Sequence, residues 1–571
     1  MAAAFKTFLE WNSDREIADA AEKLYGNIDL LELYVGLQAE EAKPLVDGAG
    51  LCPGYTVSRA ILSDAIALTR GDRFFTHDFT PFNLTSWGFA DCQRDPDAFG
   101  FGSMLGRLFL RTLPDHFTEN STYTFFPLMT PESMEVILKN LEVADQYDLS
   151  RPKYKSAPVF VEGYSRVSAV LKNKEGFTTP YKTRVDRVIQ GPGFFPVEDQ
   201  RNQQAIIKIL TSPEHFDDIG QYFYTMTKKL IDEKSYALVG GKTSGVDLVR
   251  QVVSVLPAYW VATDLASSTS FGGGGAGIEL KTKEHPSGTY TPQELYEALG
   301  EIYEFIFLDI EASRVMVLED KVKEHIKTLL RLINGGLNGA LSFTGIIGTV
   351  SSMFSKPKST EYHDIVKRLY ELGDSTDQLA NTILALMVTA GTELVIAITN
   401  TLNVYLGSDH APTLTALANK KGQFDAYVYE VLRIDPTFQG VFRISTKDQV
   451  INGQSFKKND RVFLNIASAN LDEKVFPDPF SVNLTRPAKD RLSADGVFNY
   501  LGEGLTVKIV SEVLRAVFEY TNVRRAPGQS GNLKRFKNHS RPELCYSYLS
   551  TAQLPSEWPT SMSIQYDTPR K

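Results

Sequence analysis

One loop near the C-terminus has the glycine spacing of a ligand-binding turn. It runs from Asp495 to Gly504, with Gly496 and Gly502 inside it, and an apolar segment follows at once. Glycine favours such turns because it adopts backbone conformations that other residues avoid. Tyr500 stands at the centre of the loop. Its phenol can bind a metal ion only if the pKa falls from its usual value of about 10.

A second group of candidate residues lies within the longest apolar stretch, residues 382–399. The tetrapeptide Ala390-Gly391-Thr392-Glu393 occupies its middle. Glycine inside a helix costs roughly 1 kcal/mol relative to alanine, so Gly391 needs a packing or functional reason. Thr392 and Glu393 have side chains that can handle protons, and a purely structural role fits them equally well. A membrane span tolerates a central carboxylate poorly, which predicts a long buried helix instead.

A third group contains charged residues at helical spacing. Glu430 and Arg433 lie three residues apart, which places both side chains on one face of a helix. Asp435-Pro436 ends that helix, because the residue before proline avoids helical backbone angles. Arg443 follows shortly afterwards, and its side chain stays charged and can bind a carboxylate through two hydrogen bonds. A hairpin is predicted at Asn452-Gly453, between two strand-like segments.

These motifs, in this order, resemble the cytochrome P450 superfamily. Its heme-binding loop reads F-x-x-G-x-x-x-C-x-G, which Gly496 and Gly502 match while Tyr500 takes the place of the cysteine. In that superfamily the cysteine thiolate is the axial ligand of the iron. The resemblance therefore implies heme as the cofactor, Arg443 as a residue facing it, and Gly496 and Gly502 as residues that shape the cofactor loop.

The same resemblance implies that Arg486 joins Glu430 and Arg433 in a structural, non-catalytic triad. Without the cysteine, ordinary heme-thiolate monooxygenation is not expected. Two readings of Tyr500 remain: it ligates iron as a tyrosinate, as in catalase, or it fills space in a degenerate pocket. Cys545 is not expected to replace the missing ligand, because its surroundings read as a strand without a glycine loop.

The chain is expected to contain two domains, divided near 148–152, where a polar, proline-containing segment begins. Helices are predicted from residue 8 to about 45 and at 55–70, 103–110 and 131–141. We expect a mainly α fold with a minor β portion. Its parts are a helical domain at 1–147 and a cytochrome P450-like domain at 148–571. The tetraglycine at 272–275 indicates a flexible connection.

The first 147 residues resemble the end of a cyclooxygenase-like heme peroxidase domain. The resemblance rests on the segments 30–41, 51–62, 69–76 and 78–85. Such an end fused to a cytochrome P450-like domain is similar to the fungal psi-factor-producing oxygenases, or linoleate dioxygenases, and in particular to their 10R-dioxygenase type. The resemblance covers the whole chain and about the C-terminal half of such a protein. It implies heme-dependent oxygenation of a polyunsaturated fatty acid and isomerisation of the resulting hydroperoxide.

The peroxidase motif Y-x-W-H, which supplies the radical tyrosine and the heme histidine in that family, is not found in the sequence. We therefore expect an oxylipin-family oxidoreductase whose activity is impaired in this chain. Whether the chain is an enzyme stays open. The alternative is a non-catalytic domain that serves as a scaffold or binds fatty acids.

Composition narrows the remaining possibilities. A net charge of −9 gives no basic footprint for nucleic acid. Three widely spaced cysteines argue against a disulfide framework. The N-terminal residues lack a basic region followed by an apolar run, so no signal peptide is expected from them. We expect no integral membrane span and a location in the cytoplasm or at a lipid surface. A homo-oligomer is compatible with the sequence.

Overall fold

The computed structural model describes most of the chain. The described residues are 5–42, 54–93, 100, 102–197, 200–210, 212–262, 278–283, 285–347, 369, 372, 375–420, 422–493, 501–538, 541–550 and 552–567. Tyr500, Gly496 and the tetraglycine at 272–275 lie outside these residues. Two compact units can be distinguished, unit 1 (Met1–Lys155) and unit 2 (Ser156–Lys571). The division lies inside the polar segment where a boundary is predicted.

Unit 1 is built from helices. Where one helical region is predicted from residue 8 to about 45, the structure has α1 (Phe8–Trp11), α2 (Arg15–Tyr25) and α3 (Leu33–Gln38). The predicted helical character is confirmed over the described residues, and local capping signals divide the segment into separate helices. The Asp14 side chain accepts a hydrogen bond from the backbone N–H of Glu16 and starts α2, and Gly26 ends it with a left-handed backbone (φ 68°).

The other helices of unit 1 are α4 (Tyr55–Gly71), α5 (Pro81–Asp91), α6 (Met104–Thr112), α7 (Thr122–Phe125) and α8 (Pro131–Asn140). They confirm the helices predicted at 55–70, 103–110 and 131–141. Hydroxyl side chains begin several of them, as Ser103 does for α6 and Thr130 for α8. The buried apolar cluster of α1 and α2 contains four residues: Phe8, Trp11, Ala18 and Ala21.

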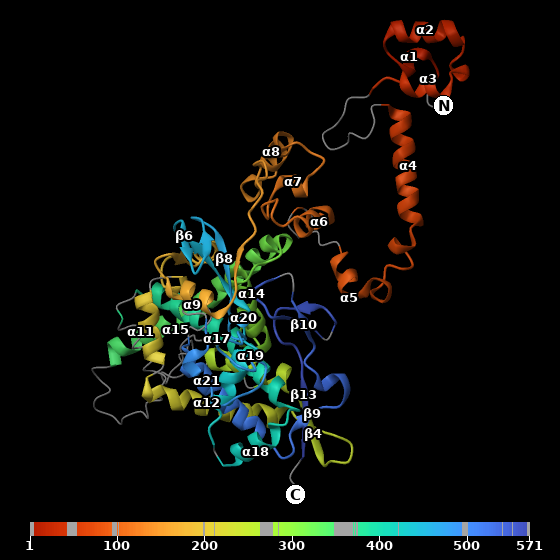
Figure 1. The fold of residues 1–571 in the computed structure, drawn as a ribbon. Helices are drawn as coiled ribbons and strands as arrows, with labels where there is room; N and C mark the ends of the chain where they lie inside the picture. The colour runs from red at the N-terminus through yellow and green to blue at the C-terminus, as the bar shows by residue number, and fades with distance from the viewer. Residues whose placement is uncertain are drawn as a thin grey trace. The chain divides into compact units, whose positions relative to one another are not determined.

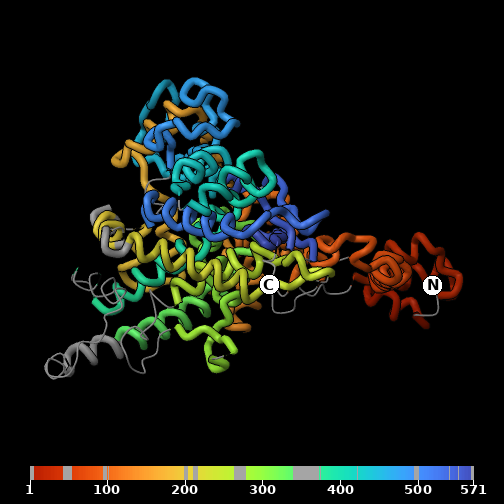
Figure 2. The backbone as a smooth tube through the Cα atoms, turned by 90° about the horizontal axis from the view of Figure 1, so that it is seen from below, coloured from red at the N-terminus to blue at the C-terminus, as the bar shows by residue number. Residues whose placement is uncertain are grey.

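Unit 2 is mainly helical (Figure 1). Its helices are α9 (Tyr164–Lys172), α10 (Lys182–Val188), α11 (Gln200–Leu210), α12 (Pro213–Lys234), α13 (Leu256–Trp260), α14 (Pro292–Phe307), α15 (Ala312–Ile347), α17 (Thr376–Tyr405), α18 (Ala411–Asn419), α19 (Asp425–Ile434), α20 (Ile466–Ala469) and α21 (Glu503–Phe518). The central element is α17, which contacts α14, α15, α19 and α21. Helix α12 packs along α21 although the two are far apart in the sequence (Figure 2).

Helix α17 confirms the predicted long buried helix. Ser375 and Gln378 form a reciprocal capping box at its start, which satisfies backbone N–H groups that would otherwise lack partners. Among the described helices, only α17 is long and apolar enough to cross a membrane, and every residue of its most apolar 18-residue stretch is buried. The apolar side chains of α17 therefore form the core of unit 2.

Small sheets complete unit 2. The largest two have the strand orders β1-β8-β5-β2 and β3-β4-β13-β9. The first joins β1 (Val159–Val161), β8 (Arg461–Asn465), β5 (Gly440–Ser445) and β2 (Phe177–Thr178); the second joins β3 (Tyr236–Ala237), β4 (Thr243–Asp247), β13 (Ser563–Asp567) and β9 (Arg524–Arg525). A third joins β10 (Arg535–Lys537), β11 (Tyr546–Leu549) and β12 (Pro555–Ser556).

The hairpin predicted at Asn452-Gly453 is confirmed. Strands β6 (Gln449–Ile451) and β7 (Gln454–Phe456) pair in antiparallel fashion on either side of it. Both turn residues have positive φ angles, 46° and 80°, as a two-residue hairpin turn requires.

Candidate functional site

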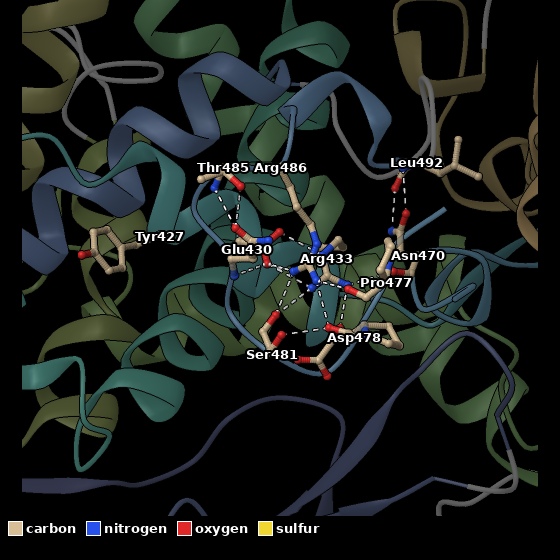
Figure 3. A network of polar contacts seen from close by, with 12 residues as sticks. Tyr427, Glu430, Arg433, Asn470, Pro477, Asp478, Ser481, Thr485, Arg486 and Leu492 are labelled. Atoms are coloured by element: carbon tan, nitrogen blue, oxygen red, sulfur yellow. Dashed lines mark hydrogen bonds and ion pairs between the residues drawn. The ribbon is translucent and has the colours of Figure 1, made fainter. Parts of the chain in front are cut away.

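A buried ion-pair network lies where the sequence places Glu430, Arg433 and Arg486 (Figure 3). Arg433 donates two hydrogen bonds to the Glu430 carboxylate, at 2.9 and 3.0 Å. Arg486 donates to the same carboxylate at 2.6 Å. The structure thus brings together the three residues that the resemblance groups as a structural triad.

The two arginines of this network also fix the backbone that follows α20. Arg433 donates to the carbonyl oxygens of Asn470, Pro479 and Ser481. Arg486 donates to carbonyl oxygens of the same turn, those of Pro477, Asp478 and Ser481. Burial raises the pKa of Glu430, but hydrogen bonds from Arg433, the Asn483 backbone and Arg486 outweigh it and hold the pKa below its usual value.

The middle of α17 is packed tightly against neighbouring protein. A methyl group added at Gly391 would lie 2.7 Å from Leu299 Cδ1 on α14, so glycine permits the close approach of the two helices. The Thr392 hydroxyl donates to the carbonyl oxygen of Val388, at 2.8 Å, and its residue is fully buried. These two residues therefore serve helix packing in the described structure.

Glu393 differs from its neighbours because its side chain lines a cavity. Burial raises its carboxyl pKa well above the usual value, and a hydrogen bond donated by Tyr303, at 3.2 Å, offsets this only in part. The neutral form of the carboxyl group is therefore favoured. It can donate a proton in a hydrogen bond as well as accept one.

The cavity lies between α17, the segment after α19, β5 and the start of α21. Its volume is about 60 Å³. The polar side chains in its wall belong to Glu393, Thr437, Arg491, Ser493, Glu503 and Thr506. Leu432, Phe438, Val441, Ile466 and Leu492 contribute apolar surface. The cavity is small, mixed in polarity and bordered by the first residues after the predicted cofactor loop.

The described ends of the loop are held by an ion pair and a glycine. Gly502 has a φ angle of 80°, a conformation that glycine readily adopts, and α21 begins directly after it. Arg491 forms an ion pair with Glu503 across the two ends of the loop. Tyr500 and Gly496 lie outside the described residues.

Arg443 lies in the β1-β8-β5-β2 sheet, on β5, and is not among the residues that line the cavity. Its guanidinium donates to the carbonyl oxygen of Phe442 at 2.9 Å, and its side chain is buried. The positive charge of Arg443 acts to lower the pKa of the buried Tyr181 phenol, whereas a negative charge on Glu543 acts to raise it. Burial raises the pKa of Tyr181 far above its usual value.

Glu543 is a buried carboxyl group close to this sheet. Neither of its side-chain oxygens has a hydrogen-bond partner among the described atoms, and the residue is 1% exposed. Burial, assisted by the nearby Asp309 charge, raises its pKa to about 8, against smaller opposing effects of Arg461 and Arg184. Glu543 is therefore largely neutral at pH 7.

Cys545 precedes β11 and does not line the cavity. Burial and the charge of Asp435 raise its thiol pKa strongly, so the thiolate that binds metals is disfavoured. This geometry gives no basis for Cys545 as a replacement ligand.

Comparison with known proteins places the fold. Residues 400–502 match the family model described as cytochrome P450. The structure is similar to that of a mutant of P450 EryK in complex with erythromycin B, with a TM-score of 0.50 at 16% identity over 77% of this chain and 99% of that one. An intact type IV self-sufficient cytochrome P450 monooxygenase also gives a TM-score of 0.50, at 16% identity over 72% of this chain and 49% of that one. Unit 2 has the cytochrome P450 fold.

Curated relatives match the chain over 99% of its length. A bifunctional dioxygenase (DOX)-epoxy alcohol synthase (EAS) of Fusarium oxysporum is 32% identical, and psi-producing oxygenase A of Emericella nidulans is 31% identical. A linoleate 10R-lipoxygenase of Aspergillus fumigatus is 30% identical. The chain is thus similar to fungal psi-producing oxygenases over nearly its whole length. It covers 45%, 53% and 51% of these three proteins, so it spans about half the length of the psi-producing oxygenases that it matches.

Heme is the cofactor of the cytochrome P450 family, and the described residues can be tested for their fit to it. Pockets for ligands of that size have volumes of roughly 300–1,000 Å³, whereas the cavity beside α17 has about 60 Å³. Gly391 packs on Leu299, and Arg443 is not part of the cavity wall. The cavity beside α17 is therefore too small for a porphyrin, while Tyr500 and Gly496 of the cofactor loop lie outside the described residues.

Two parts of the site have no counterpart in the sequence analysis. The Tyr303–Glu393 hydrogen bond joins α14 to α17, and no short-range pattern signals it. The Arg491–Glu503 ion pair does have a signal in the sequence, because its two residues carry opposite charges and stand at the two ends of the glycine loop.

Replacing Arg433 by methionine should destabilise unit 2 strongly. The substitution leaves Glu430 short of its two bonds from Arg433 and three carbonyl oxygens without this donor. Breaking a buried ion pair typically costs about 3–5 kcal/mol. Urea denaturation followed by circular dichroism measures the change.

The matched control is Lys182→Met, which removes the exposed ion pair with Asp186 on α10. This variant should lower the free energy of unfolding by about 0.5 kcal/mol or less. Equal losses in the two variants would show that the Arg433 network contributes no special stability.

Glu543→Gln should change the pH dependence of stability. The raised pKa of Glu543 means that the folded protein retains a proton that the unfolded chain loses near pH 4.5. The stabilising effect of this proton is fully present below pH 4.5 and is lost as the pH rises through about 8. Between pH 5 and 8, the free energy of unfolding of the wild type should fall by on the order of a few kcal/mol more than that of the variant.

Urea denaturation at several pH values checks this prediction. Asp448→Asn is the control, because hydrogen bonds from Lys458 and Lys457 lower the pKa of this exposed carboxyl, so its titration lies below the tested range. A wild-type minus Glu543→Gln difference that is constant from pH 5 to 8 would refute the assignment.

Proposed function

We propose that this chain is the C-terminal half of a fatty-acid oxygenase that acts in oxylipin biosynthesis. The observation that supports this most is its match, over 99% of its length, to proteins named as psi-producing oxygenase and linoleate 10R-lipoxygenase. Residues 1–147 then correspond to the end of a heme peroxidase domain, and residues 148–571 to a cytochrome P450-like domain. The substrate of the complete enzyme is a polyunsaturated fatty acid, with its hydroperoxide as the product.

In this proposal the second domain does not isomerise the hydroperoxide. Tyr500 stands where the family motif has its cysteine, and a phenol does not supply the electron-donating thiolate that favours O–O cleavage. The small cavity beside α17 supports the same conclusion, because it does not accommodate a porphyrin. Thr392 and Glu393 act in packing and in a neutral hydrogen bond, with no proton-delivery role.

A non-catalytic role for unit 2 is the second candidate, and the packing of its interior favours it. The domain retains a continuous core around α17 and a complete ion-pair network. Of the two non-catalytic roles, a scaffold fits better than a fatty-acid binder, since about 60 Å³ is also too small for a long acyl chain.

Reconstitution with hemin tests the proposal. The purified chain, mixed with one equivalent of hemin, should give an absorption spectrum like that of free hemin and no isomerised product from linoleate hydroperoxide. The Fusarium oxysporum relative, prepared in the same way, is the positive control. A Soret band that disappears in Tyr500→Phe would contradict the proposal and show tyrosinate ligation.

Tyr500→Cys distinguishes two reasons why heme should not bind: the missing cysteine ligand and the missing space for the porphyrin. If only the ligand is missing, this variant should gain a thiolate-type spectrum with carbon monoxide after reduction. If the space for the porphyrin is also missing, it should not. We expect no such spectrum, because the cavity wall is unchanged in the variant.

A further inference from the structure

The cavity beside α17 is bordered by groups that donate hydrogen bonds, and Glu393 is the first of them. Between Leu379 and Leu402 on α17, Glu393 is the only residue that is not buried, and it lines the cavity. The Tyr303 hydroxyl donates a hydrogen bond to its Oε1. Because the neutral form of the carboxyl group is favoured, the other oxygen, Oε2, can carry the proton. That proton can be donated to an acceptor in the cavity.

Arg491 supplies a second donor to the same cavity. Its side chain is 10% exposed and forms an ion pair with Glu503. Its Nε–H has no hydrogen-bond partner among the described atoms, and the residue lines the cavity. A buried donor without a partner is destabilising, so a group that accepts a hydrogen bond is favoured beside it. The guanidinium is planar and permanently charged, which suits it to bind a carboxylate.

The start of α21 is a third feature that favours an acceptor. Glu503 and Thr506, from the first turn of α21, both line the cavity. Gly502 precedes them and has no side chain that could cap the helix. The first N–H groups of a helix lack partners within it, and the helix dipole places partial positive charge there. The carboxylate of Glu503 offsets part of this charge, so the site suits a monovalent anion and not a multiply charged one.

The size of the cavity limits the anion that it can hold. Its volume of about 60 Å³ is close to the share of two water molecules in the liquid, roughly 30 Å³ each. A carboxylate of one or two carbon atoms has this size and accepts hydrogen bonds through both oxygens. Phe438 and Val441 add apolar surface to the wall, which can contact a methyl group.

We propose that this cavity is a binding site for a small carboxylate of the size of formate or acetate. One carboxylate oxygen accepts a hydrogen bond from Nε of Arg491, and the other accepts one from the carboxyl group of Glu393. The methyl group of acetate lies against Phe438 and Val441. The proposal rests on the proposed function only in that the cavity holds no porphyrin.

Saturation-transfer NMR with acetate tests the site. The purified complete chain should transfer saturation to the methyl protons of acetate, and a titration gives the dissociation constant. Arg491→Met combined with Glu503→Gln removes the donor without changing the net charge of the pair, and it should weaken binding about tenfold or more. Glu393→Leu should weaken binding to a similar degree. Glu393→Gln should bind acetate nearly as well as the wild type, because its amide keeps a donor.

The matched control is Arg524→Met, which removes an arginine of unit 2 that pairs with Asp567 at 3.0 Å and does not line the cavity. It should leave acetate binding unchanged, and circular dichroism checks that each variant is folded. Absence of transfer with heme-free wild type would overturn the proposal. Unchanged binding in either weakened variant, or displacement of acetate by an equal concentration of chloride, would also overturn it. A Soret band from bound heme would contradict both this proposal and the proposed function, whereas failure of heme-free protein to bind acetate would leave the proposed function intact.

Discussion

The buried guanidinium of Arg433 is the interaction on which the second half of unit 2 depends. It joins the end of α19 to the irregular backbone between α20 and the cofactor loop through five hydrogen bonds. Such backbone can be buried only if its carbonyl oxygens find donors. Arg486 binds the same turn and the same Glu430 carboxylate. The network therefore holds the approach to the loop in place.

That scaffold is retained while the space it supports in the cytochrome P450 family is nearly closed. The carboxyl of Glu393, which accepts a hydrogen bond from Tyr303, and the Arg491–Glu503 ion pair border a cavity of about 60 Å³. Packing around α17 and the arginine network maintain the fold, and the cavity beside α17 is smaller than a porphyrin requires.

The sequence predicted what depends on short-range spacing. Glu430 and Arg433 share one helix, and Asn452-Gly453 specifies its own hairpin, so both could be recognised locally. Apolar periodicity marked residues 8 to about 45 as helical, but it did not reveal that the cap at Asp14 begins a separate helix there. Gly391 illustrates a different limit. Its presence in a helix called for a packing or functional reason, but only the structure shows that close packing on Leu299, from a distant helix, supplies it.

The heme content of the purified chain, produced in cells supplied with a heme precursor, tests the central claim most directly. The account predicts no heme above background, because the cavity beside α17 does not hold a porphyrin. One heme per chain, with the Arg433 network intact, would contradict it.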